Sequence, residues 1–541
     1  MASTAHSTAS TASHDVDSSS IEWQVAYDAT TSLYTHPRQL AALALMRGHE
    51  PPPVETARIL ELGCATGGNL TSIALSLPNS ECVGIDPFED QIRLARERAD
   101  RASAQNVTYL PIGVSDLDQL SGSFDYIIAH GLFSWISDAH REDTLKLCHE
   151  LLSPQGVVYI SYNTYPHWYA EQTTRELLRW RHRLLTRSDA PSYTSEELVG
   201  ESRQCLELFA RYASMGQQDI LKTIYESSAK RLKQLPGWYI VHEYLLENNR
   251  AFSFEEWIEW AERYELRYLG DASPNTDLSF TLIPKKIRRE FAFAQHDSVA
   301  LDQGLDFFLN RGLRRSVMYR GAPQEQYAQS HEVNPWTRTY VKDRLSMNLF
   351  ITTPYRMRGM LSGLDEPAEY YNVTSTHSET FRTRAPSQNA LLILLGEVWP
   401  QQLSLRDTLA QAEELLRSFG LWDRGSESEL TSALHQLIGR DVILTPTWGE
   451  MSFPAQESAS NIPKLASHVR STLQDWPQSF PNMHHTSSFP SRALHWLITR
   501  WEPHLTRDEL TTLLASSPHT DKNVDELLRE AAQLALLSST P

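Results

Sequence analysis

The chain has 541 residues, 41% of them hydrophobic and 21% charged, so it is long enough for several domains and has the composition of a globular protein. Its 49 basic and 67 acidic residues give a net charge of −18, which opposes binding to nucleic-acid phosphates and to anionic membranes. The basic runs 179–187 and 285–289 are too short to form a basic face. We therefore expect no nucleic-acid partner.

The four cysteines have neither CxxC nor CxxH spacing. The absence of such spacing argues against a metal site and a disulfide framework. It favours a reducing compartment, so we expect a cytoplasmic protein. No apolar stretch reaches the roughly 20 residues of a membrane-spanning helix, and we expect no membrane insertion. Residues 1–20 are rich in Ser, Thr and Ala, which predicts a disordered extension.

Residues 21–164 carry the pattern of a parallel α/β sheet. A helix is expected at 37–46, and helical patterns at 91–101 and 141–152 separate short apolar runs. Strands alternating with helices at this spacing predict βαβ units and a sheet covered on both faces. The five runs read as strands are 58–62, 81–85, 107–110, 124–129 and 157–161.

Residues 165–321 change to long helices and form the predicted middle domain. Thr194 and Ser253 each begin a capping box, and the second box opens a helix at 254–264. Two strand-like runs, at about 266–270 and 315–319, are interpreted as the terminal hairpin of the sheet. The helices from about 165 to 251 would then be inserted before that hairpin.

The remaining chain is interpreted as a connector over 322–389 and a mainly helical domain over 390–541. Helical patterns at 390–398, 405–419 and 427–438 precede a strand-like run at 442–445, an order that predicts a winged helix. Because the stretch 405–439 is not basic, we favour a protein contact, such as a homodimer interface, over DNA binding for this domain.

The stretch from Ile59 to Leu70, ILELGCATGGNL, carries the chemistry. An apolar strand runs into a loop of small residues and then into a helix, whose free N–H groups can meet a polar ligand. A dinucleotide-binding loop has the spacing G-x-G-x-x-G. Here Gly63, Ala65 and Gly67 follow G-x-A-x-G, the spacing of S-adenosylmethionine sites. Taken without its neighbours, the loop could also be an ordinary βα turn.

Polar residues at the ends of later strands strengthen the cofactor assignment. Asp86 ends the second strand, where a carboxylate accepts hydrogen bonds from both ribose hydroxyls. Ser115 and Asp116 follow the third strand, and Asp116 is a candidate acceptor for the adenine amino group or, equally, a helix N-cap. Ligands of open α/β sheets bind at this edge, so we expect a class I, Rossmann-like methyltransferase domain.

The loops after the fourth and fifth strands are expected to flank the acceptor. His130 is a candidate general base or a group that packs on the cofactor, and Tyr162 and Asn163 are candidates for orienting an amine. Trp135 and Trp168 are either part of the site or core aromatics. A base-modifying methyltransferase would carry an Asn/Asp-Pro-Pro-aromatic motif after the fourth strand. Here that position reads HGLF, which argues against that class.

The sequence resembles bacterial class I methyltransferases that carry a methyltransferase regulatory domain, among them rickettsial-type outer-membrane protein lysine methyltransferases. The resemblance covers about residues 22–320. It rests on Tyr27-Asp28, Thr35-His36-Pro37, 63–70, Ala129-His130-Gly131, Ser134-Trp135-Ile136, 161–166, His242-Glu243-Tyr244-Leu245, Leu305-Asp306-Phe307 and Asn310-Arg311. His167 departs from the pattern, since relatives often have Gly there.

The resemblance implies roles for matching residues. Gly63, Ala65, Gly67 and Asn69 would line the methionine part of S-adenosylmethionine, with Glu61 and His130 as further cofactor contacts. Asp86 would hold the ribose, and Ser115 with Asp116 the adenine. His242-Glu243 would shape the acceptor cleft or pack between helices.

Three functions remain open from the sequence. The first is methyl transfer to lysine side chains of a protein, which the resemblance and the acidic charge favour. The second is N- or O-methylation of a small molecule, with the extra domains as a lid or dimer contact. The third is a non-catalytic scaffold that binds the cofactor, against which Gly63, Gly67 and Asp86 argue.

Overall fold

The computed structural model describes most of the chain between residues 31 and 448 and short segments beyond it. The predicted extension 1–20 and the Tyr27-Asp28 pair lie outside the described residues. The described ranges are 31–116, 119–187, 193–216, 219–273, 276, 283–291, 297–321, 349–359, 361–374, 379–423, 426–440, 442–444, 447–448 and segments between 464 and 538. The chain divides into two compact units, residues 170–247 and residues 28–169 with 248–541.

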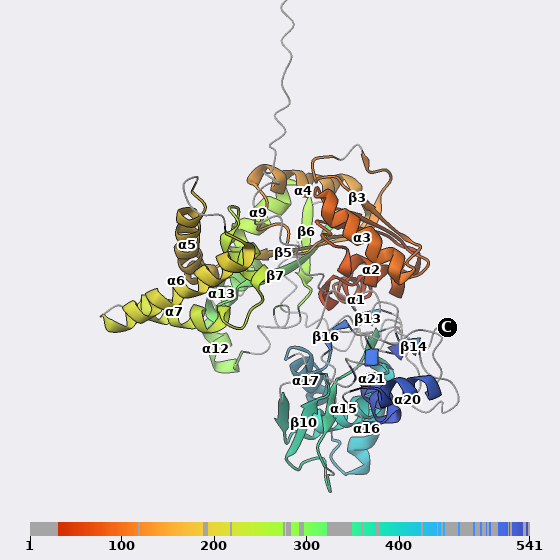
Figure 1. Ribbon diagram of the computed structural model, residues 1–541. Coiled ribbons are helices and arrows are strands. Elements are labelled where there is room, and N and C mark those ends of the chain that lie inside the picture. The colour runs from red at the N-terminus through yellow and green to blue at the C-terminus, as the bar shows by residue number, and fades with distance from the viewer. Residues whose placement is uncertain are drawn as a thin grey trace, which may run out of the picture. The chain divides into compact units, whose positions relative to one another are not determined.

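A seven-stranded sheet in the order β3-β2-β1-β4-β5-β7-β6 organises the larger unit (Figure 1). The first five strands run parallel, and β7 runs antiparallel to both of its neighbours. Predicted and observed bounds agree for the first four strands. The strands are β1 (Arg58–Leu62), β2 (Glu81–Ile85), β3 (Val107–Leu110), β4 (Phe124–Ala129), β5 (Leu152–Asn163), β6 (Leu266–Asp271) and β7 (Leu313–Arg320).

The two last strands fall where the sequence analysis expected them, but they do not form a tight hairpin. Between β6 and β7 lie α12 (Lys285–Glu290) and α13 (Ser298–Leu309). Asp297 caps α13 by accepting hydrogen bonds from the backbone N–H groups of Val299 and Ala300, both at 3.0 Å. Helices that pack beside the sheet therefore separate two strands that pair directly with each other.

Helices cover both faces of the sheet, as the near-continuous apolar strands require. On one side, here named the α1 face, residues of α1 (Pro37–Met46), α2 (Gly68–Ser76) and α3 (Glu89–Ala102) are buried with Ile59, Tyr126 and Tyr159. On the opposite side, the α9 face, residues of α4 (Asp138–Leu151) and α9 (Phe254–Arg263) are buried with Leu60 and Ile127. Successive residues of each strand thus point to opposite faces.

The elements described in the smaller unit are all helices. It contains most of α5 (His167–Leu185), then α6 (Ser195–Met215), α7 (Asp219–Leu232), α8 (Gly237–Ile240) and the π-helical turn η4 (Val241–Leu245). Thr194 and Glu197 form the predicted capping box of α6. The hydroxyl of Tyr244 donates to Glu171, which also pairs with Arg231. In this unit the turn that carries His242 and Glu243 packs among its helices.

The C-terminal part contains the three helices that the sequence analysis expected, but a short strand separates the first two, so the order predicted for a winged helix is not reproduced. Its helices and strand follow as α15 (Pro386–Val398), β12 (Leu403–Ser404), α16 (Leu405–Ser418), α17 (Ser426–Ile438) and β13 (Thr447–Trp448). The predicted strand 442–445 was wrong for residues 442–444, which belong to no strand, while Thr445 lies outside the described residues; a strand is described at Thr447–Trp448. β8 (Leu349–Ile351) pairs with both β12 and β13.

The segment interpreted as a connector also contains strands. β9 (Tyr355–Met357), β10 (Ala368–Asn372) and β11 (Thr380–Thr383) form a three-stranded antiparallel sheet. Further elements are η1 (Leu33–Thr35), η2 (Val54–Thr56), α20 (Arg507–Ala515), α21 (Val524–Gln533) and the two-residue strands β14 (Lys464–Leu465), β15 (Phe480–Pro481), β16 (Ser487–Ser488) and β17 (Leu537–Ser538).

Candidate active site

The small-residue loop between β1 and α2 has a backbone that strongly favours glycine. Gly63, Ala65 and Gly67 have φ angles of 68°, 44° and 74°, all in the left-handed region. The backbone N–H groups of Gly63 and Cys64 donate to the carbonyl of Ile85, at 2.9 and 3.0 Å. The loop is therefore fastened to the end of β2, beside Asp86.

Gly67 is required by its protein neighbours as well as by its φ angle. A Cβ atom at this position would lie 2.7 Å from the Tyr109 hydroxyl and 2.8 Å from the Cβ of Ala95. The Tyr109 hydroxyl donates to the Gly67 carbonyl at 3.0 Å. The small residue at this position therefore also permits tight packing under the loop.

We predict that Gly67→Ala destabilises the protein. The left-handed conformation alone costs a non-glycine residue about 1–3 kcal/mol, and the clash with Tyr109 adds to this cost. Gly131→Ala is the matched control, because Gly131 has a φ of 67° and nothing lies within 4 Å of its Cβ position. Urea denaturation should give a larger loss for Gly67→Ala than for Gly131→Ala, and equal losses would contradict the packing argument.

Asp86 joins the end of β2 to the loop. Its Oδ2 accepts a hydrogen bond from the Ala65 N–H at 3.0 Å, and its Oδ1 accepts one from the Phe88 N–H at 3.1 Å. Burial raises the pKa of Asp86 to about 6, partly offset by these two hydrogen bonds. Each carboxylate oxygen keeps a second lone pair, so the geometry fits two ribose hydroxyl donors.

Glu61 and Asn69 form a buried pair on the other side of the loop. Asn69 Nδ2 donates to Glu61 Oε1 at 2.7 Å, while Glu61 Oε2 is buried and accepts no hydrogen bond. Burial raises the pKa of Glu61 to about 7. An unsatisfied buried carboxylate oxygen fits a cationic donor such as the α-ammonium of the methionine part of the cofactor.

Thr35 extends this pair toward the N-terminus, a contact that sequence reasoning missed. Its hydroxyl donates to Asn69 Oδ1 at 2.9 Å, and the Ser32 backbone N–H donates to the same oxygen at 3.2 Å. These two bonds hold the Asn69 amide with its nitrogen toward Glu61. The Thr35-His36-Pro37 motif in the sequence was the signal that this segment belongs to the site.

Both acids lead to a pH prediction. The pKa values of Asp86 and Glu61 are raised by burial to about 6 and about 7, and the ionised forms are the better acceptors for hydroxyl and ammonium donors. Affinity for S-adenosylhomocysteine should therefore be highest above pH 7 and fall as pH decreases from 7 toward 5. Titration calorimetry across this range checks this prediction, and affinity that rises at low pH would contradict it.

Ser115 and Asp116 lie exposed in the turn after β3. Ser115 Oγ donates to Asp143 Oδ2 at 2.6 Å, and Asp116 Oδ2 accepts from the Gly113 N–H at 2.8 Å. Asp116 thus stabilises its own turn, close to the N-cap alternative of the sequence analysis. An adenine contact remains a prediction for both residues.

His130 lies on the α1 face at the end of β4. Its Nδ1 is 2.9 Å from the Tyr159 hydroxyl and 3.4 Å from Ser161 Oγ, which also accepts the Gly131 N–H at 2.8 Å. Burial, assisted by the positive charge of Arg315, lowers the pKa of His130 to about 4. The imidazole is therefore neutral at pH 7 and adds no positive charge to the site.

Asn163 ends β5 on the same face as Ser161. Its backbone N–H donates to Ser134 Oγ at 2.8 Å, and its carbonyl accepts from the Phe252 N–H at 2.9 Å. The side chain is 7% exposed, and its Nδ2 is buried without a hydrogen-bond partner. A buried amide nitrogen without a partner is costly, so this carboxamide is suited to a ligand group.

Tyr162 points away from His130 and Asn163. It stacks on Trp257 with ring centroids 4.4 Å apart, and its hydroxyl lies 3.1 Å from Ser316 Oγ in the α9-face core. Burial raises its pKa well above the usual value. The structure therefore places Tyr162 in packing, and its catalytic role finds no support in this position.

The two tryptophans of the predicted acceptor loops pack against each other. Trp135 and Trp168 meet edge-on with ring centroids 6.1 Å apart, and Trp168 Nε1 donates to the Gly312 carbonyl at 2.9 Å. His167 lies against the same turn, since a Cβ on Gly312 would come within 2.7 Å of its ring. Both contacts tie the start of α5 to β7.

The described residues contain neither a metal-binding cluster nor a membrane-spanning helix. No group of three or more His, Cys, Asp or Glu residues in the described part of the chain is arranged to hold a metal ion. In the same residues no helix is both long and apolar enough to cross a membrane.

Two family models match the chain. A methyltransferase domain matches residues 60–158, which contain the loop, Asp86 and His130. A predicted methyltransferase regulatory domain matches residues 237–320, which contain η4, α9, β6, α13 and β7. The first match covers β1 to β5, the part of the sheet that carries the candidate cofactor residues.

The chain is similar to two uncharacterized proteins of Rickettsia prowazekii. With one it shares 32% identity over 299 residues, which are 54% of this chain and 52% of that protein. With the other it shares 31% identity over 246 residues, which are 46% of this chain and 95% of that protein. The matched region thus spans about half the length of the first relative and nearly all of the second.

A solved structure, PKMT2 from Rickettsia typhi in complex with AdoHcy, has a similar fold. The alignment covers 94% of this chain and 99% of that chain, with a TM-score of 0.73 and 22% sequence identity. This likeness, together with the strand order, confirms the predicted Rossmann-like domain with helical additions.

Proposed function

We propose that this protein methylates lysine side chains of another protein. The chain belongs to the bacterial class I methyltransferases with a regulatory domain, and these enzymes use S-adenosylmethionine. The observation that carries the cofactor assignment is the arrangement around the β1–α2 loop. Buried carboxylates of Glu61 and Asp86 flank this loop, and Glu61 retains an unsatisfied oxygen.

When bound, S-adenosylmethionine supplies a methyl group on a positively charged sulfur. The protein's task is to align an unprotonated nucleophile with that methyl group and to exclude water. Because the imidazole of His130 is neutral at pH 7, it adds no positive charge beside the sulfonium. The Asn163 carboxamide is buried with an Nδ2 that has no hydrogen-bond partner, which supports our proposal that it orients the acceptor.

A protein acceptor is supported by three features. The chain resembles protein lysine methyltransferases of the rickettsial type, and its net charge of −18 suits a lysine-bearing partner. Only residues 60–158 match the methyltransferase domain, so most of the chain is available for contacts with a large acceptor. A small-molecule acceptor would require far less protein surface.

The acceptor class can be tested with methyl-labelled cofactor. The protein is incubated with lysine-rich proteins, and label is followed in the protein and small-molecule fractions. We expect label in the protein fraction, and none when the acceptor's lysines have been blocked by acetylation, which converts each amine into a non-nucleophilic amide. Label confined to small metabolites would refute the lysine assignment and favour a small-molecule methyltransferase. An absence of cofactor binding would favour a scaffold.

We predict that Asn163→Ala lowers kcat by about ten- to hundredfold, because misplacement of an acceptor by about 1 Å has an effect of this size. The dissociation constant of S-adenosylhomocysteine should change by less than about threefold. Tyr162→Phe is the matched control, since it removes only a hydroxyl from the α9-face core. A large loss of kcat in Tyr162→Phe with none in Asn163→Ala would reverse the two assignments.

A further inference from the structure

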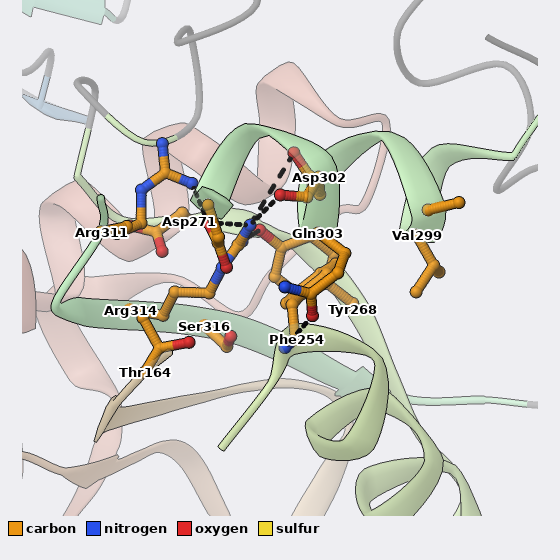
Figure 2. A network of polar contacts seen from close by, with 12 residues as sticks. Thr164, Phe254, Tyr268, Asp271, Val299, Asp302, Gln303, Arg311, Arg314 and Ser316 are labelled. Atoms are coloured by element: carbon orange, nitrogen blue, oxygen red, sulfur yellow. Dashed lines mark hydrogen bonds and ion pairs between the residues drawn. The ribbon is translucent and has the colours of Figure 1, made fainter. Parts of the chain in front are cut away.

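Two consecutive arginines of β7 point to opposite faces of the sheet. Arg314 pairs in register with Tyr162, and Arg315 pairs with Ser161. Arg314 is fully buried on the α9 face, where its Nε donates to Asp306 at 2.8 Å and its Nη2 to the Asp302 carbonyl at 3.1 Å (Figure 2). The positive charge of Arg314 is thus compensated by the buried Asp306 carboxylate.

Arg315 is in a different situation on the α1 face. Its guanidinium carbon lies 4.6 Å from the centroid of the Tyr34 ring, a cation–π contact. Its Nε is buried without a hydrogen-bond partner. Among the described residues no ion pair joins this guanidinium to a carboxylate. The buried Asp271 accepts the Arg315 backbone N–H, and the charge of Arg315 partly offsets the burial that raises the pKa of Asp271.

Tyr34 connects Arg315 to the cofactor loop. The next residue, Thr35, donates to Asn69, and Asn69 donates to Glu61. On the other side, the charge of Arg315 lowers the pKa of His130, which follows β4. The guanidinium therefore lies in the space bounded by the β1–α2 loop, η1 and the end of β4.

The α1 face thus holds two unsatisfied buried groups of opposite charge. Glu61 Oε2 lacks a donor, and Arg315 Nε lacks an acceptor. A zwitterionic α-amino acid presents an ammonium and a carboxylate, which complement these two groups. The methionine part of S-adenosylmethionine is such a group.

We propose that Arg315 binds the carboxylate of the methionine part of the cofactor, opposite Glu61 at its ammonium. This inference rests on the cofactor use in the proposed function but not on the nature of the acceptor. Arg315 holds the cofactor in place, because its guanidinium can form charge-assisted hydrogen bonds with the carboxylate. The residue lies about 250 positions after the loop in the sequence, in the region matched by the regulatory domain.

The test compares S-adenosylhomocysteine with its decarboxylated analogue, which keeps the amine and lacks the carboxylate. Calorimetry on the wild-type protein should show at least about tenfold tighter binding of S-adenosylhomocysteine, the scale of a hydrogen bond to a charged group. Arg315→Gln should bind the two ligands with equal affinity, and Arg315→Lys should restore part of the difference. Arg320→Gln, at the other end of β7, should retain the full difference.

Several outcomes would overturn the inference. If Arg315→Gln weakens both ligands equally, the residue has a structural role only. If it leaves the affinity for S-adenosylhomocysteine unchanged but raises KM for a protein acceptor, the guanidinium binds a carboxylate of the acceptor instead. A wild-type protein that binds neither ligand would refute the proposed function. Wild-type binding without preference for the carboxylate would refute the Arg315 assignment alone.

Discussion

Asp306→Ala should destabilise the larger unit by about 3–5 kcal/mol, the usual cost of leaving a buried charge unpaired. Asp306 is fully buried, and its carboxylate accepts from Arg314 Nε at 2.8 Å and from Arg311 Nη1 at 2.5 Å. The Arg314 guanidinium also lies 3.7 Å from the centroid of the Phe254 ring (Figure 2). The Asp306 carboxylate therefore connects α13 to β7, and through Arg314 it also holds Phe254, the first residue of α9.

The loss of stability in Asp306→Ala should first appear in the elements that Asp306 joins. Hydrogen exchange of the β7 and α13 amides is expected to accelerate in Asp306→Ala, and urea denaturation should show the lower free energy of unfolding. The triple variant Asp306→Leu/Arg311→Met/Arg314→Met removes all three charges of the network and should be less destabilised than Asp306→Ala. If the single variant is as stable as wild type, the network does not hold these elements together.

Asp86→Ala should weaken S-adenosylhomocysteine binding by roughly 1.5–3 kcal/mol for each ribose hydrogen bond lost, about ten- to hundredfold per bond. Calorimetry gives this value directly. The substitution also frees the Ala65 and Phe88 N–H groups, so loop disorder contributes to the loss.

The variant Asp86→Asn separates the two contributions. It keeps the size of the side chain and one acceptor oxygen, so it should hold the loop better while losing one acceptor and the negative charge. Its affinity should lie between those of wild type and Asp86→Ala, and the part of the pH dependence due to Asp86 should disappear. An unchanged dissociation constant in both variants would show that Asp86 does not hold the ribose.

The sheet was largely predictable because each of its first four strands is short, apolar and bounded by turn residues. β5 was harder, since only 157–161 was predicted as a strand, yet the strand extends from Leu152 to Asn163. Leu152 and the stretch from Val157 onward pair with β4, and Val158 to Asn163 also pair with β7, so the strand is held on both sides of its polar segment. The wrongly predicted strand near 442–445 has a related cause. A short apolar run does not by itself distinguish a strand from other conformations.

The site was predictable where its residues lie close in sequence. It was uncertain where strand register determines which side chains meet on one face of the sheet. Glu61, Gly67 and Asp86 belong to one βαβ unit with recognisable spacing. Tyr162 and Asn163 are neighbours in the chain, but alternation along β5 sends them to opposite faces. Arg315 was missed because only the pairing of β7 with β5 brings it beside His130.

The central claim is methyl transfer to lysine, and amino-acid analysis of the product tests it most directly. A lysine-rich protein is incubated with the enzyme and methyl-labelled S-adenosylmethionine, isolated and hydrolysed in acid. We predict that the label elutes as methylated lysines and that Asp86→Ala reduces it in proportion to cofactor occupancy. Label in any other amino acid, or none in the hydrolysate while small molecules become labelled, would contradict this account.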